Sequence, residues 1–219
     1  MQFHNDINQQ IIFLKNIFKL NSSSRILDVG CYNGKHLTRL QEFSEDIYGI
    51  DTTKPEEKVK NFILGNVFAS NLPEKLDGVY ILAPFFGENW NNYNQLLNRL
   101  YSNLVTGGKI ILDLYFFNDL EIGHKYQDFK VLPEKVILNN YIRQENYLLC
   151  NRTFLFKDWT SRNIELKWKI FSQNELESLA KETGFKIQNI YFDFDHKKVG
   201  TLEMQFNKTR RALVMEKLD

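Results

Sequence analysis

The sequence predicts an α/β fold with a mostly parallel sheet, followed by a smaller antiparallel sheet. Short apolar runs between residues 25 and 114 alternate with amphipathic stretches, a pattern typical of parallel strands covered by helices. Between residues 115 and 171 apolar residues recur at every second position, which indicates antiparallel strands. A chain of 219 residues, 43% of them hydrophobic, can form one large core, so we expect a single domain over residues 1–219.

An amphipathic helix is expected at the start of the chain. Ile7, Ile11 and Leu14 repeat at helical spacing, and the pattern continues to Phe18. The polar turn at residues 21–24 ends it. This helix therefore leads directly into the first strand.

A glycine-rich loop follows that strand, which spans residues 25–29. Gly30 and Gly34 can take positive φ angles, and a loop that opens a helix presents free N–H groups to a ligand. The two glycines are four residues apart and Asp28 precedes them, which argues against the G-x-G-x-x-G motif that binds dinucleotides. An ordinary turn without a ligand is the alternative interpretation.

The second strand, residues 47–51, ends in an acid. Asp51 lies about 20 residues beyond the glycine loop, where an acid can accept hydrogen bonds from ribose hydroxyls. Ligands of such sheets bind beyond the carboxyl ends of the strands. Asp51 could instead cap the next element, but the two motifs at this separation favour the ribose role.

The stretch from Asp28 to Gly34 resembles the first motif of class I S-adenosylmethionine-dependent methyltransferases, acidic-x-Gly-x-Gly-x-Gly. Tyr32 replaces the middle glycine, so its ring must either point out of the loop or form part of the cofactor's surroundings. The resemblance implies a Rossmann-like seven-stranded methyltransferase sheet with a small antiparallel β insertion after the fifth strand, and S-adenosyl-L-methionine as the cofactor. The residues that would bind this cofactor are Asp28, Gly30, Cys31, Tyr32, Gly34, Asp51, Thr52, Asn66, Val67 and Leu82.

Three further parallel strands are expected, at residues 62–64, 76–82 and 109–114. The connection from Thr52 to Leu64 is about two helical turns too short for a full crossover helix. Asn66 stands where the family often has aspartate, and its carbonyl oxygen can accept a hydrogen bond from the adenine amino group. A simple turn asparagine is the alternative. A helical stripe that ends at Gly107-Gly108 precedes the fifth strand.

The chain closes with a helix and two strands. Ser172 and Glu175 form a capping box before a helix that ends at Gly184. Strands at residues 185–194 and 211–216 are expected to pair antiparallel. This block resembles the closing block of small-molecule methyltransferases, including antibiotic amino-sugar N-methyltransferases. The resemblance covers nearly the whole chain and implies methyl transfer to an N or O atom of a small metabolite.

Residues 115–171 form the expected insertion. Its strands, at residues 136–143, 147–157 and 164–171, are expected to cover the carboxyl end of the main sheet and to keep water from the substrate. The insertion could equally form a dimer interface, so we expect a monomer or a homodimer. Expected substrate-binding residues are Phe85, Tyr115, Tyr126 and Arg143, and Tyr141 and Arg152 could also line the insertion.

The composition of the chain limits the kinds of partner that the protein is expected to bind. A net charge of +1 without a basic block argues against nucleic acid. The two cysteines, Cys31 and Cys150, make neither a disulfide framework nor a metal site. No apolar run approaches membrane-spanning length. We therefore expect a cytoplasmic protein with a small-molecule methyl acceptor and no membrane or metal partner.

Positioning is expected to dominate catalysis. The sulfonium of such a cofactor makes its methyl group electrophilic, so the protein must align the acceptor and exclude water. An amine must be unprotonated and a hydroxyl can need a base, for which His124, Glu88 and His4 are candidates. Two alternatives are a cofactor-binding protein with a non-methylating reaction and a degenerate binding protein that has lost the cofactor.

Overall fold

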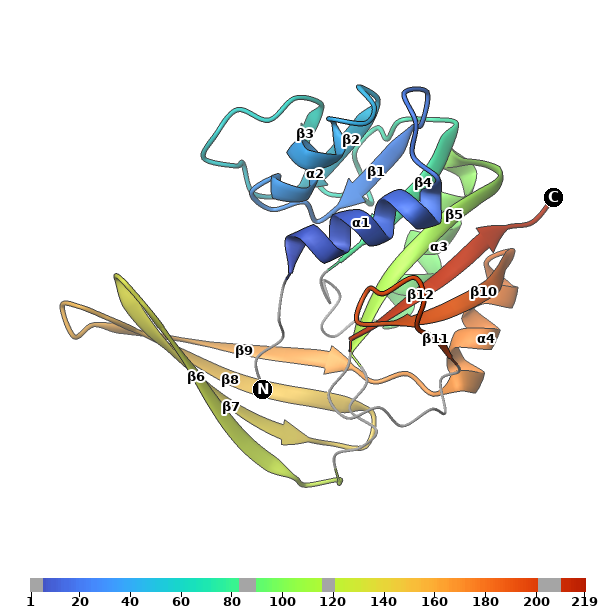
Figure 1. Ribbon diagram of the computed structural model, residues 1–219. Helices are drawn as coiled ribbons and strands as arrows, with labels where there is room; N and C mark the ends of the chain where they lie inside the picture. Colours follow the sequence, from blue (N-terminus) through green and yellow to red (C-terminus); the bar gives the residue numbers. More distant parts are fainter. Residues whose placement is uncertain (1–5, 83–89, 116–120, 201–209) are drawn as a thin grey trace.

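The computed structural model describes residues 6–82, 90–115, 121–200 and 210–219. His4, Phe85 and Glu88 lie outside the described residues, as does the side chain of Tyr115. The main body is a mixed sheet with helices on both faces, and a separate antiparallel sheet lies beside it (Figure 1).

Within the described residues, the main sheet has eight strands in the order β11-β10-β12-β5-β4-β1-β2-β3. The strands are β1 (Ile26–Val29), β2 (Ile47–Asp51), β3 (Phe62–Leu64), β4 (Leu76–Ile81), β5 (Leu104–Tyr115), β10 (Phe185–Phe192), β11 (Val199–Gly200) and β12 (Arg210–Lys217). The first five pair in parallel, whereas β12 runs antiparallel to both β5 and β10. The seven expected strands are confirmed, and β11 adds a short eighth at the edge.

In the described part of the chain, four helices cover the two faces of this sheet. On one face lie α1 (Ile7–Phe18) and α2 (Lys35–Leu40), whose buried side chains share a core with the strands. On the other lie α3 (Trp90–Asn103) and α4 (Gln173–Glu182). The Asp6 carboxylate caps α1 by accepting the N–H groups of Asn8 and Gln9, and the capping box expected at α4 is present.

Two boundaries differ from the sequence prediction. The helix α3 ends at Asn103, and β5 already begins at Leu104 instead of residue 109. Gly107 and Gly108 therefore lie inside the strand, next to a register shift against β4, and Gly107 has a φ of 75°. The glycine pair marks an irregularity within a strand, although it resembles a helix end in sequence.

The insertion contains four strands instead of the three expected. They are β6 (Lys125–Leu132), β7 (Lys135–Arg143), β8 (Tyr147–Phe156) and β9 (Ser161–Lys169), paired antiparallel in that order. The sequence prediction missed β6 because charged residues interrupt its alternation and most of its side chains are exposed.

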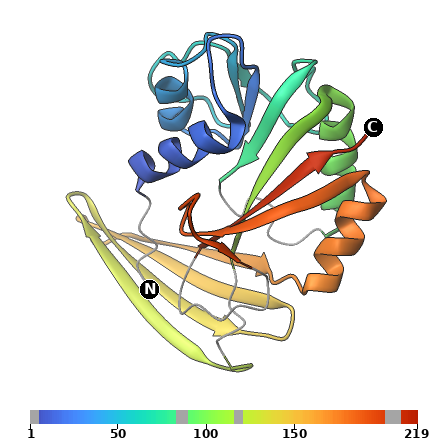
Figure 2. The same ribbon diagram turned by 45° about the vertical axis from the view of Figure 1, so that its right-hand side comes forward.

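The antiparallel sheet lies beyond the carboxyl ends of β1 and β4, on the side toward which these strands point (Figures 1 and 2). One face of this sheet is buried, with Tyr141 at 6% exposure and Leu148 and Cys150 at 0%. The neighbouring positions on the opposite face, such as Asn140 and Asn151, are exposed. The buried residues of this face form a core cluster with Ile170, against which Tyr126, Leu166 and Trp168 pack.

A buried ion pair joins the strand ends at this edge. The Arg210 guanidinium, at the start of β12, donates two hydrogen bonds to the Asp113 carboxylate of β5 and a third to the Leu82 carbonyl at 3.0 Å. Both charged side chains are almost fully buried. Three segments that are far apart in the chain are thus fixed at one point.

Arg210→Met should destabilise the protein strongly, because it leaves the Asp113 carboxylate buried without its partner. We expect a loss of about 3–5 kcal/mol in the free energy of unfolding, measured by urea titration. Lys157→Met is the matched control, since the Lys157–Glu134 pair is exposed and should contribute at most about 1 kcal/mol. Equal losses in the two variants would contradict a special role of the buried pair.

Candidate active site

The glycine loop is tied to the end of the neighbouring strand. The Gly30 and Cys31 N–H groups both donate to the Ile50 carbonyl, at 2.8 and 3.3 Å. The next N–H, that of Tyr32, donates to the Asp51 carboxylate at 2.8 Å. The two motifs found in the sequence therefore form one hydrogen-bonded unit at the carboxyl edge of β1 and β2.

The three glycine positions of the family motif all have positive φ angles in this chain. They are 79° at Gly30, 48° at Tyr32 and 71° at Gly34. A side chain at such a position costs about 1–2 kcal/mol, so Tyr32 carries local strain that a glycine would avoid. At Gly34 a Cβ atom would also lie 2.8 Å from a methyl group of Val59, so glycine is required there for space as well.

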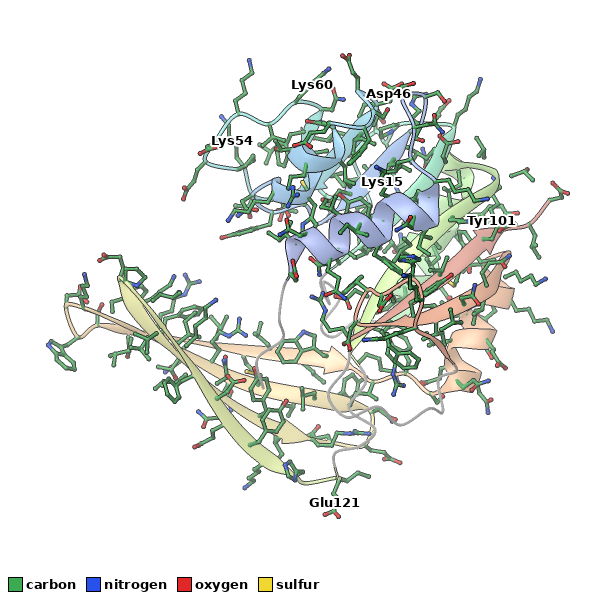
Figure 3. The ribbon with its side chains drawn as sticks, in the orientation of Figure 1. Lys15, Asp46, Lys54, Lys60, Tyr101 and Glu121 are labelled. Atoms are coloured by element: carbon green, nitrogen blue, oxygen red, sulfur yellow. The ribbon has the colours of Figure 1, made fainter. Side chains whose placement is uncertain are left out.

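The ring of Tyr32 points out of the loop, which is one of the two arrangements that the sequence allowed. Its side chain is 68% exposed. It lines a cavity of about 870 Å³ together with residues 53–59, the start of α1 and the outer side of α2. Figure 3 shows Lys54, one of the lining residues, on the projecting segment between β2 and β3.

Asp51 is buried and makes two backbone hydrogen bonds. One carboxylate oxygen accepts from Tyr32 and the other accepts from the Thr53 N–H at 2.8 Å. Each carboxylate oxygen can accept a second hydrogen bond, so the side chain can hold the loop and still bind a hydroxyl group. Thr52, beside it, is exposed.

Asp28 lies below the loop in a fully buried position. Burial raises the pKa of its carboxyl to about 7, and the nearby Asp51 raises it further, whereas the Tyr80 hydroxyl has the opposite effect. That hydroxyl lies close to Asp28 without reaching hydrogen-bond geometry. Near neutral pH, Asp28 is therefore partly protonated.

Cys31 faces the core and not the cleft side of the loop. A Cβ atom on Gly49 would lie 2.8 Å from its sulfur, so the thiol fills the space that this glycine leaves in β2. Burial raises the pKa of the thiol well above its usual range. Only the backbone of Cys31, and not its side chain, is therefore available to contact a ligand.

The other expected cofactor residues lie at the carboxyl ends of β3 and β4. The Asn66 side-chain oxygen accepts the Phe68 N–H at 2.9 Å, so Asn66 has the turn role that the sequence analysis left open. Val67 is buried, and the Leu82 carbonyl accepts from Arg210. The carboxyl ends of four of the parallel strands, β1 to β4, thus contribute to one edge.

His36 and Gln10 form a polar contact that the sequence did not predict. The His36 Nε2 atom lies 2.8 Å from the side-chain oxygen of Gln10, a residue of α1 that is only 3% exposed. Burial, together with the charges of Arg210 and Arg39, lowers the pKa of His36 to about 4, so the imidazole is neutral. The sequence feature that could have predicted this contact is Gln10, a polar residue on the apolar face of the first helix.

The buried face of the insertion carries aromatic rings. The rings of Tyr126 and Tyr141 are stacked, with centroids 4.4 Å apart, and Trp168 lies 6.3 Å from Tyr141. Burial raises the pKa of both tyrosines above their usual range, so both hydroxyls keep their protons. His124 is exposed, and its ring centroid lies 6.1 Å from that of Tyr126.

A polar chain lies beside these rings. Asn139 donates to the Asp128 carboxylate at 2.6 Å and accepts from Arg152 Nε at 2.7 Å. Arg143, which the sequence analysis favoured, is buried and donates to the Glu145 carbonyl in the turn that follows β7. Arg143 and Arg152 both lie on the aromatic face, where Arg143 is paired with Leu148 and Arg152 with Asn139.

Together, the glycine loop, the strand-end acid and the order of the main sheet define a class I methyltransferase fold. The sequence profile of a methyltransferase-domain family matches residues 7–190, so the chain belongs to that family. This confirms the resemblance drawn from the sequence and identifies the protein as a methyltransferase.

Solved structures with the same fold are numerous. An S-adenosylmethionine-dependent methyltransferase from Clostridium acetobutylicum has a TM-score of 0.79 at 12% identity, over 99% of this chain and 94% of that one. A methyltransferase from Streptomyces caelestis has a TM-score of 0.76 at 14% identity, over 98% and 90%. A sugar N-methyltransferase from Streptoalloteichus has a TM-score of 0.75 at 14% identity, over 99% and 90%. At these identities the likeness shows the fold. No curated protein sequence matches the chain significantly.

None of the described helices is long and apolar enough to cross a membrane. The described residues also contain no cluster of three or more His, Cys, Asp or Glu side chains that could hold a metal ion.

The raised pKa of Asp28 predicts an unusual pH dependence of stability. Its folded-state pKa of about 7 lies above the value of about 4 in an unfolded chain, so the folded state binds the extra proton between these values. The contribution of Asp28 to stability is thus greatest at low pH and is lost as the pH rises from about 4 through about 7. Relative to Asp28→Asn, wild type should lose about 3 kcal/mol of unfolding free energy between about pH 5 and about pH 8, in urea titrations. Parallel profiles for the two proteins would mean that Asp28 titrates normally.

Proposed function

We propose that this protein transfers the methyl group of S-adenosyl-L-methionine to a nitrogen or oxygen atom of a small metabolite. The observation that carries the proposal is the hydrogen-bonded unit of glycine loop and Asp51 at the carboxyl edge of the sheet. The two unpaired, buried cysteines fit a cytoplasmic location.

The residues at this edge fit the proposed cofactor. A side chain is missing at Gly30 and Gly34, where the backbone must come close to a ligand, and the Asp51 carboxylate has lone pairs left for ribose hydroxyls. The Asn66 amide and the backbone of Val67 are proposed to contact the adenine, and Thr52 and Leu82 to flank it. The cofactor, when bound, supplies an activated methyl group, so these residues have to bind and orient it.

The acceptor is proposed to lie between this edge and the buried face of the insertion. Aromatic rings at Tyr126 and Tyr141 offer flat apolar surfaces, and the Asp128–Asn139–Arg152 chain offers fixed hydrogen-bonding groups beside them. The sugar N-methyltransferase among the structural neighbours is one precedent for a small acceptor on this fold.

Catalysis is proposed to rest on positioning and on the exclusion of water by the insertion. His124 is the one proposed base that the structure describes, and it is exposed at the start of β6. His4 and Glu88 remain proposals, as do the substrate contacts of Phe85 and Tyr115. The substrate contact of Arg143 also remains a proposal, beside its hydrogen bond to the Glu145 carbonyl.

Replacement of Asp51 tests the cofactor site. Asp51→Ala should weaken the binding of S-adenosylmethionine and S-adenosylhomocysteine about tenfold to hundredfold in calorimetric titrations, because it removes hydrogen bonds to a charged group. Asp46→Ala is the matched control, since Asp46 lies at the opposite end of β2, far from the insertion (Figure 3). Failure of the wild type to bind either compound would favour a degenerate binding protein. Unchanged affinity in Asp51→Ala would remove the ribose role.

Replacement of a tyrosine in the Tyr126–Tyr141 stack tests the proposed acceptor site. Radiolabelled methyl transfer to a panel of small amines and alcohols, amino sugars included, would first identify an acceptor. Tyr126→Ala should then raise the KM for that acceptor about tenfold and leave cofactor affinity unchanged. Tyr147→Ala removes the same side chain from the opposite face of the sheet and should have little effect. Cofactor binding with no transfer to any acceptor would favour a non-methylating reaction.

A further inference from the structure

The first helix carries a buried polar residue on its apolar face. Gln10 is 3% exposed and lies one turn before the buried residues Phe13 and Leu14 of α1. Its side-chain oxygen lies 2.8 Å from His36 Nε2, so the imidazole donates this hydrogen bond and the amide accepts it. Burial of an amide is costly unless the amide is hydrogen-bonded, so the pair favours one position of α1 against α2.

The helix that carries His36 holds the end of the glycine loop. α2 begins directly after Gly34 and has only six residues. A helix of this length has little stability of its own, so the packing of its side chains determines where it lies. Leu37 and Leu40 are buried and pack without a preferred direction, whereas the hydrogen bond of His36 requires a defined distance and angle. The position of the last loop residue therefore depends on α1.

Further contacts of α1 extend this link to the other half of the sheet edge. Arg39 of α2 donates to the side-chain oxygen of Asn8. The Gln9 side-chain amide donates to the Asp193 carbonyl at 2.7 Å, in the turn that follows β10. The Asp193 carboxylate in turn accepts the Arg210 N–H at 3.2 Å. The start of α1 thus connects α2 with the strand ends that the ion pair of Arg210 fixes.

We propose that Gln10 and His36 are positioning residues for the methyl transfer, because their hydrogen bond holds the glycine loop at a fixed place relative to the Arg210 ion pair. Figure 1 shows the first turn of α1 at this edge, on the side of the insertion. A fixed loop keeps the cofactor aligned with the acceptor, and neither side chain has to touch the cofactor for this effect. The inference rests on the proposed function for the reaction that it aligns, and on the contacts alone for the coupling of α1 to the loop.

A purely structural role of the pair predicts a different result from a positioning role. Replacement of both partners of a buried hydrogen bond by apolar residues of similar size can leave stability nearly unchanged. An apolar pair has no preferred direction, so α1 and α2 can shift against each other. Global stability and loop position therefore separate in the double variant Gln10→Leu/His36→Leu.

Hydrogen exchange tests the coupling in the free protein. In the double variant the amides of residues 30–36, several of which are hydrogen-bonded, should exchange about tenfold faster than in wild type. Residues 109–112 of the central strand β5 report global stability and should exchange as in wild type. Asn16→Leu is the matched control, since Asn16 of the same helix has an exposed contact with His196. Unchanged loop exchange in the double variant, or an equal rise in the loop and in β5, would overturn the proposal.

Calorimetric titration with S-adenosylhomocysteine tests the consequence for the cofactor site. The dissociation constant should rise about tenfold in the double variant and stay at the wild-type value in Asn16→Leu. His36→Gln keeps an N–H donor of similar reach and should bind nearly as wild type does. Affinity that is unchanged in the double variant, or equally reduced in His36→Gln, would contradict the positioning role. A wild type that binds no cofactor would instead remove the proposed function, while faster loop exchange in the double variant would still support the coupling of α1 to the loop.

Discussion

The structure depends on the hydrogen bond that joins Asp51 to the backbone of the glycine loop. Parallel strands bring their carboxyl ends to one edge, but a loop that contains two glycines has little to hold its shape. Bonds to Ile50 and Asp51 fix the loop against the end of β2. The acid expected to bind the ribose therefore also shapes the loop, so cofactor affinity and loop geometry depend on the same side chain.

The same edge is fixed on its other side by a second charged contact. Arg210 joins the ends of β4, β5 and β12, and its charge also lowers the pKa of His36. The glycine loop and Asp51 hold the half of the edge proposed for the cofactor. The ion pair of Arg210 with Asp113 holds the half that faces the insertion, so both sides of the proposed reaction have rigid support.

Sequence reasoning succeeded where the determinants are local. Glycine spacing, Asp51 and the capping box at Ser172 are read within a few residues, and the structure confirms their placement. It failed where contacts between residues far apart in the chain determine the local structure. Arg210 and Asp113 are 97 residues apart, β6 pairs without a clear apolar alternation, and Cys31 turns inward because Gly49 of another strand leaves room. Arg152 and Arg143 look equivalent in sequence, and only their hydrogen-bond partners in the structure, the Asn139 side chain and the Glu145 carbonyl, distinguish them.

The two departures from the family pattern explain each other. A tyrosine at a position with a φ of 48° needs space for its ring outside the loop, and a full crossover helix after β2 would compete for that space. Here the connection is short, residues 53–59 line a cavity instead of forming a helix, and the ring of Tyr32 extends along this cavity. Val59 of the same segment packs against Gly34 and supports the loop. A chain that had merely lost its cofactor site would not need this mutual fit, so the departures favour a modified site over a degenerate one.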